Sequence, residues 1–236
     1  MDKKISIVFP SRNRNKLLTR SVLSLIETAK DFKNNVEILI AMDMDDCDSI
    51  KYISQLLSSI GSKNFIESNF KILITERYTY KYLHKYVNQL CKIAKGEWLF
   101  LWNDDVIMKT ENWDEAILQN KDFCVLKVLT INGEFGGLPF PIIPKKWFQA
   151  TGHFSGNCSC DTWILKVCEQ IQRQININVI KNIYNIKVYH DRYLETGNNN
   201  DQTQSEIQYD TKNFFSRKQE KQREQDANNI CKILKG

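Results

Sequence analysis

Five apolar residues, Trp98–Trp102, run without a break and are followed directly by Asn103, Asp104 and Asp105. A short continuous apolar run is typical of a strand that is buried on both faces of a sheet. Carboxylates at the end of such a strand are costly to bury unless a positive group meets them. In open α/β sheets, ligands bind beyond the carboxyl ends of the strands. The run therefore predicts either a cation-binding strand end or, alternatively, a strand that leaves the core through polar turn residues.

The chain before this run alternates between two kinds of apolar segment. Short β-branched segments predict strands, and apolar residues spaced three or four apart predict helices. In chain order, the predicted strands are residues 5–9, 36–41 and 70–75, and the predicted helices are residues 18–29, 50–60 and 83–94. This alternation predicts an α/β fold with a mostly parallel central sheet and helices on both faces. Because parallel strands end at one edge, Arg12, Asp43 and Asp105 are expected to be neighbours in space.

The second half of the chain shows a less regular pattern. Strands are predicted at residues 122–130 and 183–189, the latter ending at His190. Helices are predicted around Trp113, at residues 144–148 and from Asp161 onward. No linker long enough to separate independent domains is present, so residues 1–210 are predicted to form one domain.

The net charge of +5 is unevenly distributed. Residues 211–236 contain seven Lys or Arg and three Asp or Glu, hence +4, so the other 210 residues carry only +1. A nearly neutral body argues against nucleic-acid binding, which usually needs a basic face. The basic segment is predicted to be a helical tail over residues 214–234. Its charged face is typical of a solvated surface or an oligomer contact, with binding to a membrane surface or a nucleic acid as the alternative.

Cysteine usage and hydropathy favour a cytoplasmic protein. The seven cysteines follow no disulfide-scaffold spacing, which predicts reduced thiols. No apolar run approaches the roughly 18 residues that span a membrane. The apolar run at residues 5–9 is too short for the core of a signal peptide.

The order of these motifs resembles the GT-A glycosyltransferases, and within them the family 2-like enzymes that use nucleotide-sugar donors. The resemblance extends over residues 5–206. The loop at residues 9–14 is similar to the family's first nucleotide-binding loop, and Asp43 to the aspartate that recognises the nucleobase. The segment Asn103–Asp105 looks like the Asp-x-Asp signature. The resemblance implies that the donor is bound by Pro10, Ser11, Arg12, Arg14, Asp43, Asn103 and Asp104.

Two later segments complete the resemblance, and two positions depart from it. Asp161 lies in a segment similar to the one that carries the catalytic base, and His190 resembles the metal-binding histidine. Asn103 stands where the family has its first aspartate, so Asp105 is expected to carry most of the metal coordination. The family's acidic pair at the base position is reduced here to the single carboxylate of Asp161, and Glu134 is a second candidate.

The resemblance implies a metal-dependent glycosyltransferase that uses Mn²⁺ or Mg²⁺. Such an enzyme moves a sugar from a nucleotide-diphosphate donor to a glycan or another acceptor hydroxyl, with inversion when a base activates the hydroxyl. Asp105 and His190 would hold the metal, because carboxylate and imidazole ligands together suit manganese. The nucleotide-binding half is then expected to cover residues 1–110, and the acceptor-binding half residues 111–210.

Other interpretations of the chain remain open. A nucleotidyltransferase usually needs a glycine-rich loop with a lysine after the first strand, and residues 10–14 contain no glycine. A non-catalytic binding module on the same scaffold is compatible with Asn103 and with the single acid at position 161. The aromatic residues Phe140, Trp147 and Phe148 are either core residues, the commoner role of such side chains, or a stacking platform for an acceptor sugar.

Overall fold

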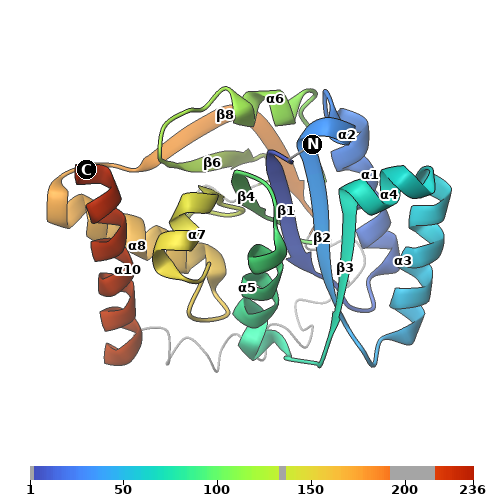
Figure 1. The fold of residues 1–236 in the computed structure, drawn as a ribbon, viewed down its shortest axis with the longest axis horizontal. Coiled ribbons are helices and arrows are strands. Elements are labelled where there is room, and N and C mark those ends of the chain that lie inside the picture. Colours follow the sequence, from blue (N-terminus) through green and yellow to red (C-terminus); the bar gives the residue numbers. More distant parts are fainter. Residues whose placement is uncertain (1–2, 133–136, 192–215) are drawn as a thin grey trace.

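The computed structural model describes residues 3–132, 137–191 and 216–236. They form one mixed sheet with helices on both of its faces, and this confirms the predicted α/β class (Figure 1). The strands are β1 (Ile5–Pro10), β2 (Val36–Asp43), β3 (Phe70–Thr75), β4 (Trp98–Leu101), β5 (Val106–Met108), β6 (Val125–Thr130), β7 (Ile142–Pro144) and β8 (Ile180–His190). Their order across the sheet is β3-β2-β1-β4-β7-β6-β8-β5.

The first four strands are parallel, as the alternating pattern predicts. Strand β1 pairs with β2 on one side and β4 on the other, and β3 pairs with the far side of β2. Residues 36–43 of β2 are buried along their whole length, because helices cover both faces of this part of the sheet. All four strands therefore end at the same edge.

The helices connect these strands and cover the sheet. They are α1 (Asn15–Thr28), α2 (Phe32–Asn35), α3 (Cys47–Ile60), α4 (Lys63–Asn69), the 3₁₀ turn η1 (Tyr80–Tyr82), α5 (Leu83–Ile93), α6 (Trp113–Leu118), α7 (Lys145–Thr151), α8 (Cys160–Ile175) and α10 (Arg217–Lys235). Successive side chains of a strand point to opposite faces. In β1, Ile7 and Phe9 therefore pack with α1, whereas Val8 packs with α5.

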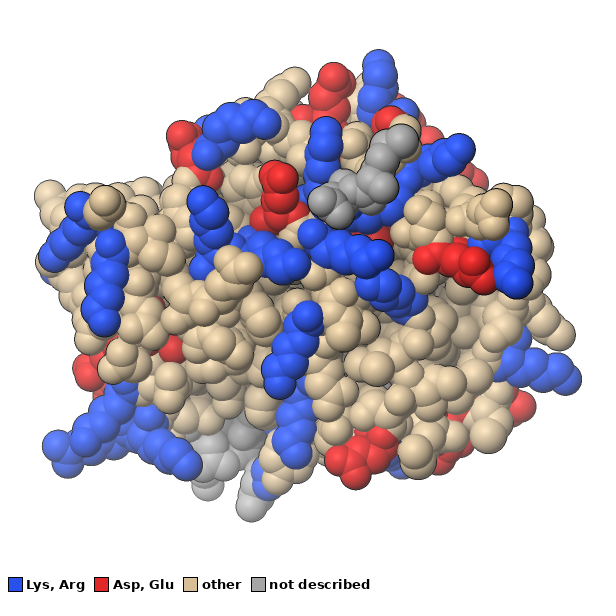
Figure 2. Space-filling model, viewed as in Figure 1, with Lys and Arg blue, Asp and Glu red and all other residues tan. Residues whose placement is uncertain are grey.

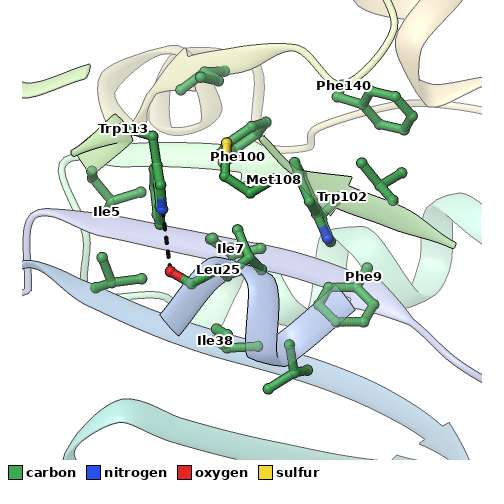
Figure 3. Close-up of a cluster of buried hydrophobic side chains, with 14 of the residues drawn as sticks. Ile5, Ile7, Phe9, Leu25, Ile38, Phe100, Trp102, Met108, Trp113 and Phe140 are labelled. Atoms are coloured by element: carbon green, nitrogen blue, oxygen red, sulfur yellow. Dashed lines mark hydrogen bonds between the residues drawn. The ribbon is translucent and has the colours of Figure 1, made fainter. Parts of the chain in front are cut away.

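The core beside α1 holds the aromatic residues that support the edge of the sheet (Figure 3). Phe100 and Trp102 lie edge to face at 5.0 Å between ring centroids, and Phe100 also contacts Trp113. The indole N–H of Trp113 donates to the carbonyl of Leu25 in α1 at 3.2 Å. Trp102 is fully buried. Aromatic packing thus fixes the end of the apolar run at Trp102.

The antiparallel part of the sheet contains two short strands that the sequence pattern did not predict. Strand β7 pairs antiparallel with β4, and β5 pairs antiparallel with the end of β8. Each has only three residues, too few for a period-2 pattern to be recognised. Strand β6 begins at Val125 rather than at residue 122, and β8 begins at Ile180 rather than at residue 183.

The C-terminal helix α10 packs onto α7 and α8. Its Ala227, Ile230 and Cys231 are buried within the chain, although most of its surface is charged. The predicted helix thus exists, with bounds shifted by up to three residues. No helix in the described part of the chain has the length and apolar character to cross a membrane.

Candidate functional site

Four segments meet at the carboxyl edge of the sheet, as the parallel topology requires. They are the loop after β1, the end of β2, the segment after β4 and the end of β8. Three ion pairs join the loop after β1 to Asp43, Asp104 and Asp105, so the residues expected to be neighbours lie around this one loop. Arg12 contacts Asp43, and Arg14 contacts both Asp104 and Asp105.

Asp43 forms one end of this cluster, and both of its carboxylate oxygens have partners. Arg12 Nη1 donates to Oδ2 at 3.0 Å, and the Tyr86 hydroxyl donates to Oδ1. Asp43 is 5% exposed. Arg12 Nη2 also donates to Asp45 at 3.1 Å, so its guanidinium bridges two carboxylates. Burial, reinforced by the bond to Asp43, raises the pKa of Tyr86 well above its ordinary value. The phenol therefore stays protonated and remains a donor at neutral pH.

Asp104 ties the first loop to the end of β4. Its Oδ2 accepts from the Ser11 hydroxyl at 2.7 Å, and its Oδ1 accepts from Arg14 at 3.1 Å. Burial raises the pKa of Asp104, to about 6, and Arg14 opposes that rise while the neighbouring charge of Asp105 adds to it. Ser11 and Arg14 thus provide hydrogen bonds to both oxygens of this buried carboxylate.

Asp105 forms the other end of the cluster and is less completely satisfied. Its Oδ2 lies 3.3 Å from Arg14 Nη1, and its Oδ1 lies 3.2 Å from His190 Nε2. The contact with His190 is within ion-pair distance but is not aligned as a hydrogen bond, so buried Oδ1 accepts none. Burial alone would raise the pKa of Asp105, but His190 and Arg14 outweigh it and lower the pKa below its ordinary value. Asp105 is therefore an ionised carboxylate with one unfilled oxygen.

Two side chains and one backbone hydrogen bond hold the end of β8 and His190 in place, a role that the sequence did not predict for any of the residues involved. The Asn132 amide donates to the carbonyl of His190 at 2.6 Å and accepts from its N–H at 3.1 Å. The Phe140 ring packs edge to face on the imidazole at 5.0 Å and also contacts Trp102 at 5.9 Å. Asp191 N–H donates to the carbonyl of Asp105 at 2.7 Å, which fixes β8 to the segment after β4.

Phe140 adopts an unusual backbone conformation between Pro139 and Pro141. Its φ of 51° lies in the left-handed region, which bulky residues rarely occupy and which costs on the order of 1–3 kcal/mol. Phe140, Trp147 and Phe148 are all buried, so the core interpretation of these aromatic residues holds. Phe140 is nevertheless close to the site, because its ring lies between Trp102 and His190.

Asp161 lies in the first turn of α8, where the sequence places it. Its Oδ1 accepts from the N–H of Thr162 at 2.6 Å and from the Thr162 hydroxyl at 3.3 Å. An acid in the first turn of a helix is also a favourable partner for the helix dipole, whatever its chemical role. Glu134, the second candidate base, lies outside the described residues.

Asp105 and His190 together present a carboxylate oxygen and an imidazole nitrogen, the kinds of atom that bind divalent cations. Within residues 3–132, 137–191 and 216–236, no group of three His, Cys, Asp or Glu side chains is arranged to hold a metal. Two ligands are nevertheless enough where substrate phosphates and water complete the coordination, as is usual for Mg²⁺. The unfilled oxygen of Asp105 and the adjacent imidazole fit such a site.

Comparison with known proteins identifies related sequences and folds. The model for glycosyl transferase family 2 matches residues 6–197. No curated protein matches the chain. Among solved structures, S. aureus TarS 1–349 in complex with UDP is 17% identical, with a TM-score of 0.61, over 79% of this chain and 60% of that one. TarS 1–349 in complex with UDP-GlcNAc is 14% identical, with a TM-score of 0.60, over 91% and 67%.

A third similar structure is the mannosyltransferase PcManGT from Pyrobaculum calidifontis in complex with GDP-Man and Mn²⁺. It is 8% identical, with a TM-score of 0.62, over 83% of this chain and 59% of that one. At such identities the likeness concerns the fold, and it confirms the predicted GT-A architecture. The chain spans 60% of the length of the first TarS structure.

Proposed function

The chain belongs to glycosyl transferase family 2, and we propose that it transfers a sugar from a nucleotide-diphosphate donor to an acceptor hydroxyl. The observation that carries this proposal is the cluster in which Asp43, Asp104, Asp105 and His190 meet the loop after β1. The similar structures in complex with UDP, UDP-GlcNAc and GDP-Man support a nucleotide-sugar donor at this edge.

Asp43 is proposed to recognise the nucleobase. A carboxylate oxygen has two lone pairs, so Asp43 can accept from a base N–H while Tyr86 still donates to it. Arg12 donates to Asp43, and its second contact, with Asp45, fixes the position of the guanidinium. The residues Pro10, Ser11 and Asn103 shape the remainder of the donor site in this proposal, with Ser11 acting through its bond to Asp104.

Asp105 and His190 are proposed to hold a divalent cation, Mn²⁺ or Mg²⁺, at the diphosphate. When bound, the cation stabilises the negative charge that develops on the leaving diphosphate. Arg14 lies beside both Asp104 and Asp105 and adds a fixed positive charge at the same position. The Mn²⁺ complex of the similar mannosyltransferase supports this choice of cofactor.

Asp161 is proposed to act as the general base. It would take the proton from the acceptor hydroxyl, whose oxygen then bonds to the anomeric carbon. The bond from that carbon to the diphosphate oxygen breaks on the opposite face, so the configuration inverts. The position of Asp161 at the start of α8 supports this role, because it lies in the acceptor-binding half, which we place at residues 111–210.

Calorimetric titration with UDP and GDP, with Mn²⁺ or with EDTA, tests the proposal. We expect one of the two nucleotides to bind, and to bind at least tenfold more tightly with Mn²⁺. The variant Asp122→Asn should bind the nucleotide as the unmodified protein does, because Asp122 is an exposed acid that contacts Lys181 away from the cluster. If neither nucleotide binds the folded protein under either condition, the proposed function is wrong.

A further inference from the structure

We propose that a pocket between the start of α5, residues 153–163 and the start of α10 binds the acceptor, and that this acceptor is an anionic saccharide. The pocket has a volume of about 500 Å³, and its lining includes Lys81, Tyr82, His153, Asn157, Lys218 and Gln219. This inference rests on the proposed function, because it assigns the second substrate of the same reaction. The pocket is separate from the cluster of Asp43, Asp104, Asp105 and His190, which we call the donor cluster.

The pocket is built on a buried network that fixes α10. Asp226 of α10 is 1% exposed. Its Oδ2 accepts from the indole N–H of Trp163 at 2.9 Å and lies 2.8 Å from His153 Nε2, and its Oδ1 accepts from Gln222 at 3.1 Å. The Arg223 guanidinium lies over the Trp163 ring at 5.3 Å. These contacts join α10 to the start of α8, so the wall of the pocket is held in a fixed position.

The α10 wall lies outside the part of the chain that matches the family model. That match ends at residue 197, whereas α10 covers Arg217–Lys235. The side chains that α10 contributes are therefore a property of this chain rather than of the family's matched core. A pocket that depends on them is suited to a ligand specific to this protein.

The position of the pocket suits the second substrate. Tyr82 lies one helical turn before Tyr86, whose hydroxyl donates to Asp43 at the donor cluster. Trp163 lies two residues after Asp161, the candidate base. In Figure 1, α5 and α10 both begin at the lower edge of the molecule. Along the chain, the lining of the pocket is thus close both to a residue that contacts Asp43 and to the residue proposed to activate the acceptor.

The chemistry of the lining favours a hydroxylated and negatively charged ligand. The Gln219 amide and the 40% exposed ring of Tyr82 line the pocket, and Gln219 Oε1 accepts from the buried Asn157 amide at 2.6 Å. Amides pair with sugar hydroxyls as donors and acceptors. The Lys81 and Lys85 ammonium groups lie 5.5 and 4.7 Å from the Tyr82 ring centroid. Figure 2 shows Lys and Arg side chains over α5 and at the lower end of α10.

The lining residues given by the structure include two lysines and no acid. Asp226 lies beneath them and is engaged by three partners, so its carboxylate is not presented to a ligand. Positive side chains recognise phosphate and carboxylate groups alike. The lining therefore favours a sugar that carries either a phosphate or a carboxylate group. The experiment below distinguishes these two groups.

Titration followed by NMR of the asparagine and glutamine side-chain amides tests this inference. The probes are glucose 6-phosphate, glucuronate and uncharged methyl glucoside, each added in the presence of Mn²⁺ and UDP or GDP, whichever binds. We expect one of the anionic probes to shift the Asn157 and Gln219 signals. The affinity obtained from this titration should be at least tenfold higher than that of methyl glucoside. Which anion binds better distinguishes phosphate from carboxylate recognition.

Lys218→Glu should weaken the anionic probe at least tenfold. Lys232→Glu is the matched control, because it makes the same change in the last turn of the same helix, and it should change affinity less than twofold. Equal affinity of the anionic probes for Lys218→Glu and the unmodified protein, or no shift of the Asn157 and Gln219 signals, overturns the inference.

Nucleotide binding separates this failure from failure of the proposed function. Lys218→Glu should bind the nucleotide normally. If nucleotide binds and the probes leave the pocket signals unchanged, the acceptor assignment alone fails. If neither nucleotide binds, the proposed function fails, and the acceptor role falls with it.

Discussion

The two ends of the donor cluster differ in how completely their carboxylates are satisfied. Asp43 has a partner on each oxygen, Tyr86 on one and Arg12 on the other. Asp105 keeps a buried oxygen that accepts no hydrogen bond. A buried carboxylate oxygen that accepts no hydrogen bond keeps its lone pairs available, so the Asp105 end gains more from a ligand that approaches this oxygen. The comparison distinguishes an end that is already hydrogen-bonded from the end at which we propose that a cation binds.

Replacement of Asp161 with Asn should reduce turnover more than any other substitution considered. It should leave nucleotide binding at Asp43 and Asp105 unchanged. We expect acceptor-dependent release of nucleotide to fall by about 10²–10⁴-fold, the usual contribution of a general base. Nucleotide affinity should stay within twofold, measured by calorimetry. Asp48→Asn is the control, since Asp48 is a first-turn acid of α3 and shares only the helix-dipole role. Full turnover in Asp161→Asn would remove the base assignment.

Replacement of Asp105 with Asn tests the incomplete end directly. The substitution removes the charge that a cation would meet, so nucleotide affinity in Mn²⁺ should fall by about 100-fold, or roughly 3 kcal/mol. Affinity in EDTA should change little, and calorimetry under both conditions measures the difference. An equal loss with and without Mn²⁺ would show that Asp105 acts as an ordinary structural carboxylate.

Replacement of Asp43 with Asn tests the satisfied end and should give the opposite pattern. A hydrogen bond to a charged group contributes about 1.5–3 kcal/mol, so nucleotide affinity should fall by about 10–100-fold. Because this end needs no cation, the loss should be the same in Mn²⁺ and in EDTA. A loss confined to Mn²⁺ would abolish the distinction between the two ends.

Replacement of Phe140 with Leu should have the smallest effect and should sharpen the comparison. The ring holds the imidazole of His190, and an aromatic pair contributes about 0.5–1.5 kcal/mol. Mn²⁺-dependent nucleotide affinity should therefore fall by about 2–10-fold, while affinity in EDTA is unchanged. The control Phe148→Leu removes a buried ring from the other core cluster. The same loss in both variants would indicate general loosening of the core.

The location of the site could be predicted because it depends on strand ends. Residues 98–102 are recognisable as a buried run, and parallel topology then brings the ends of β1, β2 and β4 to one edge. For that reason the loop after β1 reaches Asp43 through Arg12 and Asp105 through Arg14. The GT-A fold could likewise be predicted from the order of the motifs, since the predicted strands of the first half, β1 to β4, lie where the alternating pattern places them.

The supporting contacts could not be predicted, because they depend on packing between distant segments. Tyr86 has the spacing of a core residue in α5, and only the docking of α5 on the sheet brings its hydroxyl to Asp43. Asn132 reaches His190 because β6 and β8 pair in parallel, and the three-residue strand β5 aligns the end of β8. No local pattern in the sequence encodes either contact.

The continuity of the sheet has a mechanical consequence. Strand β4 pairs with β1 on one side and with β7 on the other, so one hydrogen-bonded ladder joins the two halves of the molecule. Opening these halves like a hinge would break that ladder and expose the aromatic core beneath it. We therefore expect substrates and products to exchange through local movements of side chains and connecting segments, which cost far less than rigid-body separation.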